Sequence, residues 1–220
     1  MADMTLVIGN RNYSSWSLRP WLAMRVGGLD FAELVIPLDR PDTGARIAEH
    51  GPAGRVPVLH HGSVTVWESL AICEYVAEIT PGAGLWPDDP AARAVARAVS
   101  AEMHAGFGAL RAALPMNVRA RRPGVPVAAA VRTDIERIGR LWRDCRDRFG
   151  AGGDYLFGRF SIADAMFAPV ASRFRTYDVS LGSVERAYCD AVHALPAMAE
   201  WAAAAAAEPW TIEAEEVGGP

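Results

Sequence analysis

Three serine hydroxyls lie close together near the start of the chain, at Ser14, Ser15 and Ser17. They follow an apolar segment, residues 5–9, and precede a helical pattern, residues 18–26, so they fall where a strand leads into a helix. Such a junction presents unpaired backbone N–H groups and the positive end of the helix dipole, which favour an anion such as a thiolate or an oxyanion. The same hydroxyls could equally do no more than cap the helix.

The first part of the sequence alternates short apolar runs with helical patterns, which is typical of an α/β unit. Strands are expected over residues 5–8, 34–36, 55–59 and 64–67, and helices over residues 18–26 and 69–79, with Ser69 as the N-cap of the second helix. Residues 39–53 are polar and contain Gly and Pro, so they indicate a loop with at most a short helix. The last two strands should form a hairpin.

A stretch rich in Pro and Gly then separates this unit from a part of the chain that contains only helical patterns. We expect a domain over residues 1–82, a linker over 83–90 and an all-helical domain over 91–220. Its helices are expected over residues 91–114, 127–149, 184–192 and 196–207, with another that begins at Ser161 and kinks at Pro169. The acidic, Gly-rich tail, residues 213–220, is expected to fray.

Composition excludes several classes of protein. The chain has 220 residues, is 51% hydrophobic and carries a formal charge of -4, which argues against a general role on nucleic acid or membrane surfaces. No apolar run is long enough to cross a membrane, and residues 1–4 lack the basic start and apolar core of a signal peptide. We therefore expect a soluble, cytoplasmic protein. Every basic side chain is Arg and Ala is abundant, which indicates GC-rich coding and a bacterial source.

Other kinds of chemistry lack the residues they need. Neither Ser14 nor Ser69 lies in a Gly-x-Ser-x-Gly motif, so a hydrolase of that type is excluded. The five histidines show no zinc-ligand pattern, and no metal is expected. There is no Cys-x-x-Cys for dithiol chemistry, and the three cysteines, Cys73, Cys145 and Cys189, are expected to be reduced, buried and inert.

Four stretches, in this order and spacing, resemble the glutathione S-transferase superfamily. They are Ser14 to Ser17, Arg55-Val56-Pro57-Val58-Leu59, Glu68-Ser69-Leu70-Ala71-Ile72-Cys73-Glu74-Tyr75, and Phe160-Ser161-Ile162-Ala163-Asp164. The resemblance implies a thioredoxin-like N-terminal domain that holds glutathione as co-substrate, and a C-terminal helical bundle that walls off a second substrate. It also implies a cytosolic homodimer with a role in detoxification.

The resemblance assigns the catalytic hydroxyl to Ser14, which would donate a hydrogen bond to the sulfur of glutathione and so lower its pKa. Ser15 is the neighbouring candidate and Ser17 a rival. The serine loop looks most like that of the zeta class, although Trp16 stands where that class often has cysteine. Trp16 therefore argues against a mixed disulfide in this loop and counts against a zeta-type isomerase.

The resemblance also assigns a role to each part of the glutathione site. Val56 precedes Pro57, which the family keeps cis, so its backbone can pair with the cysteinyl part of glutathione like one more strand. Ser69 would bind the γ-glutamyl carboxylate and Glu68 the α-ammonium. Ser15 and Arg55 complete the binding residues. Taken alone, the pair Glu68-Ser69 favours an ordinary helix start over a binding site.

For the electrophile pocket the candidates by position are Asn12, Trp16, Met103, His104, Phe107 and Asn117. Met103 and Phe107 also fit the apolar stripe of a helix, so core packing competes with a pocket role. Arg119, Arg121 and Arg122 could attract an acidic substrate or could simply be solvated. Ser161 and Asp164 fit a capping box, which we take to be structural.

The sequence therefore predicts a serine-type glutathione transferase that acts on a small electrophile. Two alternatives stay open. One is another glutathione-dependent reaction on the same fold, either peroxide reduction or cis-trans isomerisation of a small unsaturated diacid. The other is a non-catalytic binding module that keeps the fold.

Overall fold

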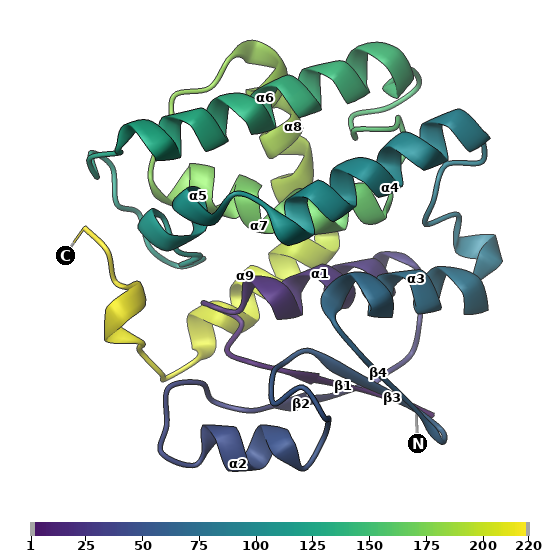
Figure 1. Ribbon diagram of the computed structural model, residues 1–220, viewed down its shortest axis with the longest axis vertical. Helices are drawn as coiled ribbons and strands as arrows, with labels where there is room; N and C mark the ends of the chain where they lie inside the picture. The colour runs from purple at the N-terminus through teal and green to yellow at the C-terminus, as the bar shows by residue number, and fades with distance from the viewer. Residues whose placement is uncertain (1–2, 219–220) are drawn as a thin grey trace.

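A four-stranded mixed sheet is followed by a bundle of helices in the computed structural model, which describes residues 3–218 (Figure 1). The strands are β1 (Met4–Ile8), β2 (Ala32–Val35), β3 (Val58–His61) and β4 (Val64–Trp67), and their order in the sheet is β2-β1-β3-β4. β1 is parallel to β2 and antiparallel to β3, and β3 and β4 form a hairpin. The predicted fold class, a thioredoxin-like domain before a helical bundle, is confirmed.

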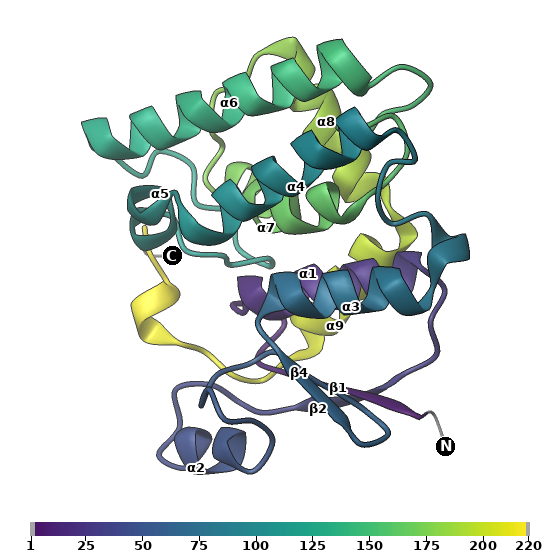
Figure 2. The same ribbon diagram turned by 45° about the vertical axis from the view of Figure 1, so that its right-hand side comes forward.

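Alternate residues of β1 face opposite sides of the sheet, as the period of a strand requires. Leu6 and Ile8 belong to the main hydrophobic core, which also contains residues of α1 (Ser15–Val26) and α3 (Ser69–Ile79). Val7 belongs to a smaller cluster with Ile47 of α2 (Thr43–Ala48). α1 and α3 therefore cover one face of the sheet and α2 packs on the other, as Figure 2 shows.

The helical part is built around α7 (Ile162–Thr176), which contacts α1, α4 (Pro90–Ala105) and α8 (Ser183–Ala194). The remaining elements are α5 (Gly108–Ala113), α6 (Ala129–Phe149), α9 (Pro196–Ala207) and the short 3-10 turns η1 (Pro81–Ala83) and η2 (Glu213–Glu215). α1 lies between α3 and α7 and is buried nearly all round, so one core runs through both halves of the molecule. No helix within residues 3–218 combines the length and apolar character needed to cross a membrane.

The single helix expected over residues 91–114 is in fact two, α4 and α5. The chain turns at Gly106, which is extended, and at Phe107, whose φ of 60° is left-handed. Asp134 of α6 accepts a hydrogen bond from the backbone N–H of Leu110 at 2.9 Å, which satisfies a donor at the start of α5. Because the apolar stripe continues across the break, the hydrophobic pattern gave no sign of it. By contrast, α7 continues past Pro169.

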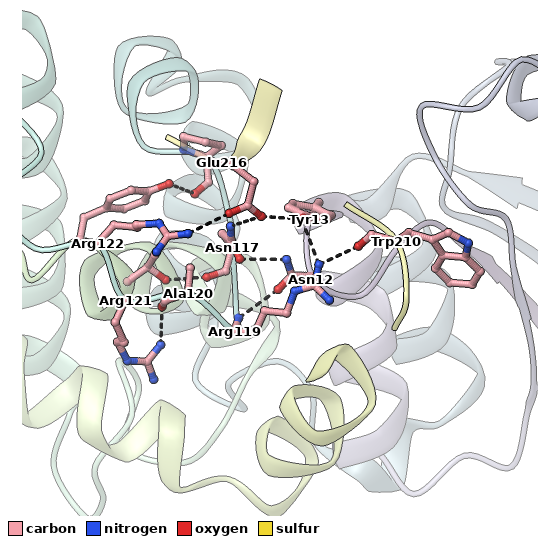
Figure 3. Close-up of polar contacts among 12 residues, drawn as sticks. Asn12, Tyr13, Asn117, Arg119, Ala120, Arg121, Arg122, Trp210 and Glu216 are labelled. Atoms are coloured by element: carbon pink, nitrogen blue, oxygen red, sulfur yellow. Dashed lines mark hydrogen bonds and ion pairs between the residues drawn. The ribbon is translucent and has the colours of Figure 1, made fainter. Parts of the chain in front are cut away.

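The prediction that the tail frays is wrong for the part that the structure describes. One carboxylate oxygen of Glu216 accepts hydrogen bonds from Tyr13 Oη at 2.6 Å and Asn117 Nδ2 at 2.8 Å, and the other accepts from Arg122 Nη2 at 3.2 Å (Figure 3). These contacts bind the tail to segments far away in the sequence. Gly219 and Pro220 lie outside the described residues.

The predicted capping box at the start of α7 is present. Asp164 Oδ2 accepts a hydrogen bond from the backbone N–H of Ser161 at 2.8 Å, and its Oδ1 accepts one from Leu156 N–H at 3.0 Å. The carboxyl group is wholly buried, and burial raises its pKa to about 6. Asp164 thus joins the loop before α7 to the helix, and it lines neither of the two cavities described below.

Candidate active site

Two adjoining cavities lie between the sheet domain and the helical bundle. The first cavity has a volume of about 210 Å³ and is lined by Trp16, Ala53, Arg55, Val56, Pro57, Trp67, Glu68, Ser69 and His104. The second cavity, of about 550 Å³, is lined by Tyr13, Ser14, Ser15, Trp16, Leu38, Ile47, Gly54, Arg55, Val56, Arg111, Arg173, Ile212 and Glu215. Trp16, Arg55 and Val56 form the boundary between them.

Ser14 is the N-cap of α1 and lies in the wall of the second cavity. Its Oγ accepts a hydrogen bond from the backbone N–H of Ser17 at 3.3 Å and lies 2.7 Å from Ser17 Oγ. Ser17 Oγ in turn accepts a hydrogen bond from Gly9 N–H at 3.0 Å. Ser14 therefore caps the helix and also faces the cavity, so its capping role does not exclude a role in binding a ligand.

The direction of the hydrogen bond between Ser14 and Ser17 follows from burial. Ser17 is wholly buried, so its proton needs an acceptor, and Ser14 Oγ is the acceptor that the described residues offer. Ser17 therefore donates to Ser14. The proton of Ser14 is then left to donate to a group in the second cavity, such as a sulfur atom.

Ser69 lies one position further into its helix than the sequence suggested. α3 begins at Ser69, and Glu68 is the N-cap residue. The φ of Glu68 is 71°, a backbone conformation that residues other than Gly rarely adopt. The Ser69 hydroxyl is buried, lines the first cavity and has no hydrogen-bond partner within residues 3–218. A buried polar group of this kind, at a helix N-terminus, is placed to bind an anionic ligand.

The backbone at Val56 is also available to a ligand. The Val56-Pro57 bond is cis, as the resemblance implied. Val56 precedes β3, and neither its N–H nor its C=O makes a backbone hydrogen bond to another described residue. Because Val56 lines both cavities, a peptide bound here could reach from one into the other.

Two guanidinium groups and an imidazole contact Trp16. Arg19 Cζ lies 4.3 Å from the centre of a Trp16 ring and Arg111 Cζ lies 5.1 Å from it, and His104 packs edge-on at 5.2 Å. His104 Nε2 lies 3.6 Å from Glu68 Oε2. Burial, followed by the charge of Arg19, lowers the pKa of His104 below its ordinary value of 6.5, so the ring is neutral at neutral pH.

Arg19 and Arg173 are charged residues in the core that sequence reasoning missed. Arg173 is 3% exposed; its Nε donates to Leu114 O at 2.9 Å and its Nη2 to Ser15 Oγ at 3.3 Å. Burial lowers the pKa of Arg173 to about 10 and that of Arg19 to about 9. The available signal was an arginine inside each of two otherwise apolar helical patterns.

Four of the residues proposed for the electrophile pocket lie outside the walls of both cavities. Asn12 Nδ2 donates to Asn117 Oδ1 at 2.9 Å, so this pair joins the loop after β1 to the chain after α5 (Figure 3). Met103 and Phe107 are buried in the main core. Trp16 and His104 do line the first cavity, as do Arg55, Val56, Pro57, Glu68 and Ser69, while Ser14 and Ser15 line the second.

The three arginines suggested for an acidic substrate also have other contacts. Arg119 donates to the carbonyl groups of Glu208 at 2.7 Å and Trp210 at 2.6 Å, Arg121 donates to Ala120 O at 2.6 Å, and Arg122 pairs with Glu216 (Figure 3). They bind the tail or their own loop. The guanidinium groups of the second cavity are those of Arg55, Arg111 and Arg173.

The cysteines are buried, as predicted, and belong to the core. Burial raises the pKa of the thiols of Cys73, Cys145 and Cys189 to about 12 each. At neutral pH they stay protonated, which makes them poor nucleophiles. Within residues 3–218, no group of three or more His, Cys, Asp or Glu side chains is placed to hold a metal ion.

Comparison with known proteins gives consistent matches. The sequence model described as "Glutathione S-transferase, N-terminal domain" matches residues 13–79, and "Glutathione S-transferase, C-terminal domain" matches residues 93–204. The chain is 27% identical to maleylacetoacetate isomerase from Rattus norvegicus over 176 residues, 78% of each chain. It is 34% identical to a probable maleylacetoacetate isomerase from Caenorhabditis elegans over 97 residues, which is 44% of each chain.

Among solved structures, a glutathione transferase homologue from Burkholderia with bound glutathione has a TM-score of 0.72 to this chain. The two are 22% identical, and the match covers 93% of this chain and 99% of the other. At this identity the likeness shows a shared fold.

Proposed function

Because this chain belongs to the glutathione S-transferase family, we propose that it is a serine-type enzyme that ionises the thiol of glutathione beside Ser14. The observation that carries this proposal is the 2.7 Å contact between the hydroxyls of Ser17 and Ser14, with Gly9 N–H donating to Ser17. We infer that Ser17 donates to Ser14, because Ser17 is wholly buried, and this leaves the Ser14 proton for an acceptor in the second cavity. The thiolate would then attack a small electrophile in that cavity.

The first cavity offers a complement to each polar part of glutathione. Ser69 and the N-terminus of α3 would bind the γ-glutamyl carboxylate, and Glu68 the α-ammonium. The Val56 backbone would pair with the cysteinyl residue and direct its side chain towards Ser14. Arg55, exposed at the rim of both cavities, would bind the remaining carboxylate.

The free energy needed is within reach of these groups. The thiol has an ordinary pKa of about 8.5, and each unit of lowering corresponds to about 1.4 kcal/mol. A hydrogen bond to a charged group contributes about 1.5–3 kcal/mol, and the start of a helix about 0.3–1 kcal/mol more. Ser14 at the start of α1 could therefore lower the thiol pKa by about one to three units.

In the proposed reaction the thiol proton leaves to solvent and the sulfur lone pair forms a C–S bond. A leaving group departs with its electron pair, or a conjugated acceptor takes up a proton at the adjacent carbon. The protein's own residues bind glutathione, hold its sulfur at Ser14 and seat the electrophile against it; no cysteine of the protein takes part.

A second candidate is a glutathione-dependent cis-trans isomerase, which the likeness to maleylacetoacetate isomerases favours. Here the thiolate would add to a C=C bond, the resulting single bond would rotate, and the thiolate would leave again. Glutathione would be returned unchanged, so its stoichiometry distinguishes this reaction from conjugation. The serine loop looks zeta-like, but Trp16 stands where that class often has cysteine.

The rest of the proposal follows the family resemblance. We propose a homodimer in the cytoplasm of a bacterium, with a role in detoxification. Residues 1–82 would form the glutathione domain and residues 91–220 the helical domain, joined by residues 83–90. Light scattering at working concentration tests the dimer, and a monomer would contradict it.

The experiment that tests the proposed function measures conjugate formation from glutathione and 1-chloro-2,4-dinitrobenzene. Ser14→Ala should lower kcat/KM by about 10- to 100-fold, which is the rate equivalent of one lost charge-assisted hydrogen bond. Ser100→Ala is the matched control, because that buried hydroxyl donates only to Ala96 O of its own helix. An unchanged rate in Ser14→Ala would remove Ser14 from the mechanism.

A further inference from the structure

Three guanidinium groups without carboxylate partners lie at or near the second cavity: Arg111 and Arg173 line it, and Arg19 packs on Trp16 of its wall. None of Arg19, Arg111 and Arg173 forms an ion pair with an acidic side chain of residues 3–218. Nη1 of Arg173 and all three nitrogens of Arg19 are buried and lack a hydrogen-bond partner within the same residues. Besides burial, the charges of Arg173 and Arg111 lower the pKa of Arg19, and the charge of Arg111 lowers that of Arg173.

Such an arrangement is costly for the folded protein. A buried charge is normally paired, because an unpaired one loses its hydration without compensation. Buried donors without partners are rare in folded proteins and gather at sites where a ligand supplies the missing acceptor. We therefore expect an anion to bind beside Arg19, Arg111 and Arg173.

The cluster is placed to meet a substrate. Arg111 and Arg173 line the second cavity together with Ser14, and Arg173 Nη2 lies 3.3 Å from the hydroxyl of Ser15. The same guanidinium group carries Nη1, whose N–H groups have no acceptor among the described residues and can donate to a ligand. Arg19 does not line the cavity, but its Cζ lies 4.3 Å from the centre of a ring of Trp16, which does.

The charges at the second cavity favour one kind of anion. Arg55 is assigned to glutathione above, so Arg19, Arg111 and Arg173 supply three positive charges against a single acidic residue of the cavity wall, Glu215 of the tail. A bound thiolate and one carboxylate would neutralise the remaining positive charge, whereas a thiolate with a phosphate dianion would exceed it. A planar carboxylate also fits a guanidinium fork.

We propose that Arg111 and Arg173 bind a carboxylate of the electrophilic substrate, so that the preferred substrates are small electrophiles whose acid group lies a few bonds from the reacting carbon. This inference rests on the proposed function, since it places the electrophile in the second cavity beside Ser14. It names the chemical class of the second substrate and the residues that select it.

The first experiment measures binding without glutathione, so that nothing can react. The probes are 4-chloro-3-nitrobenzoate and its methyl ester, titrated into the protein by calorimetry. We expect the acid to bind at least about tenfold more tightly than the ester, because a hydrogen-bonded charge contributes about 1.5–3 kcal/mol. Equal affinity for the two probes would overturn the proposal, whatever the enzyme does with glutathione.

Variants locate the acid group. Arg173→Met and Arg111→Met should each lower the affinity for the acid by about 10- to 100-fold and leave the ester unchanged. Arg175→Met is the matched control, because Arg175 lies on the same helix as Arg173 but is exposed and lines neither cavity. Since Arg173 is buried and bonded, Arg111→Met serves as the test if Arg173→Met fails to fold.

The second experiment adds glutathione and measures turnover, in which a C–S bond forms and chloride leaves with its electron pair. If Arg173→Met or Arg111→Met loses turnover of 4-chloro-3-nitrobenzoate but not of its methyl ester, the proposal is supported. An equal loss for the acid and the ester overturns it. If Arg173→Met or Arg111→Met instead abolishes thiolate formation with acid binding intact, the guanidinium serves the sulfur and the proposal is wrong. A wild type that binds the acid selectively but never ionises glutathione would contradict the proposed function alone.

Discussion

Replacing Ser17 by alanine separates the structural part of the serine loop from its chemical part. The Ser17 hydroxyl is wholly buried, accepts the Gly9 N–H at 3.0 Å and donates to Ser14 Oγ at 2.7 Å. Its removal leaves the N–H of Gly9, which is also buried, without an acceptor, at a cost of about 1–3 kcal/mol in the free energy of unfolding. For a chain of this size, 2 kcal/mol corresponds to a fall in Tm of about 4–8 °C.

The same substitution should affect the thiol only in part. In Ser17→Ala, Ser14 keeps its own proton for the sulfur but loses the donor that fixes its direction. We expect the pKa of the bound glutathione thiol to rise by less than about one unit in Ser17→Ala and by about one to two units in Ser14→Ala, which loses the whole hydrogen bond to the sulfur. Thermal unfolding followed by circular dichroism, and the ultraviolet absorbance of the thiolate, measure the two effects.

The control is again Ser100→Ala, whose hydroxyl bonds only within its own helix, so its loss should change Tm little. Two results would refute this reasoning. One is a Ser17→Ala protein that unfolds at the wild-type temperature; the other is an identical thiol pKa in Ser14→Ala and Ser17→Ala.

Three further predictions concern stability and the second cavity. Asp164→Ala should lower the free energy of unfolding by at least about 2 kcal/mol, because the N–H groups of Leu156 and Ser161 lose their acceptor, and it should leave glutathione affinity unchanged. Urea unfolding measures the first effect and calorimetry the second. A loss of stability under about 0.5 kcal/mol would contradict this prediction. Burial lowers the pKa of His193 below 6.5, so the unfolded chain binds the proton more readily than the folded protein, and stability falls as the pH drops through 6.5. In urea unfolding, His193→Gln should lessen this fall between pH 7 and pH 5. Parallel curves of stability against pH for the wild type and the variant would contradict the prediction. Glu215→Gln removes the carboxylate of the second cavity and should tighten binding of 4-chloro-3-nitrobenzoate about fivefold in calorimetry, whereas unchanged affinity would count against our charge assignment.

Local sequence signals were enough for most of the fold. Short apolar runs predicted the strands, and helical stripes predicted the long helices, because each element buries apolar side chains. The capping box at Ser161 and the cis bond at Val56-Pro57 were predicted as well. The break at Gly106 was missed, since it depends on Asp134 from a helix more than twenty residues away.

The walls of the first cavity were more predictable than those of the second. Val56, Glu68 and Ser69 lie in short motifs, so their resemblance to a known family could be seen in the sequence. The second cavity draws Arg173 from the middle of α7 and Glu215 from the tail, and only the packing of distant segments brings these together. Arg119, Arg121 and Arg122 looked like substrate-binding charges because the sequence does not reveal their backbone and tail partners.

The pKa of the thiol of bound glutathione tests the central claim most directly. It is measured by an ultraviolet difference titration of the thiolate against pH, with wild type, Ser14→Ala and Ser100→Ala compared. We predict that the wild type and Ser100→Ala titrate about one to three units below the ordinary value of about 8.5, and that Ser14→Ala titrates less than about one unit below it. Glutathione that binds to the wild type with an unshifted thiol pKa would contradict the claim that Ser14 ionises it.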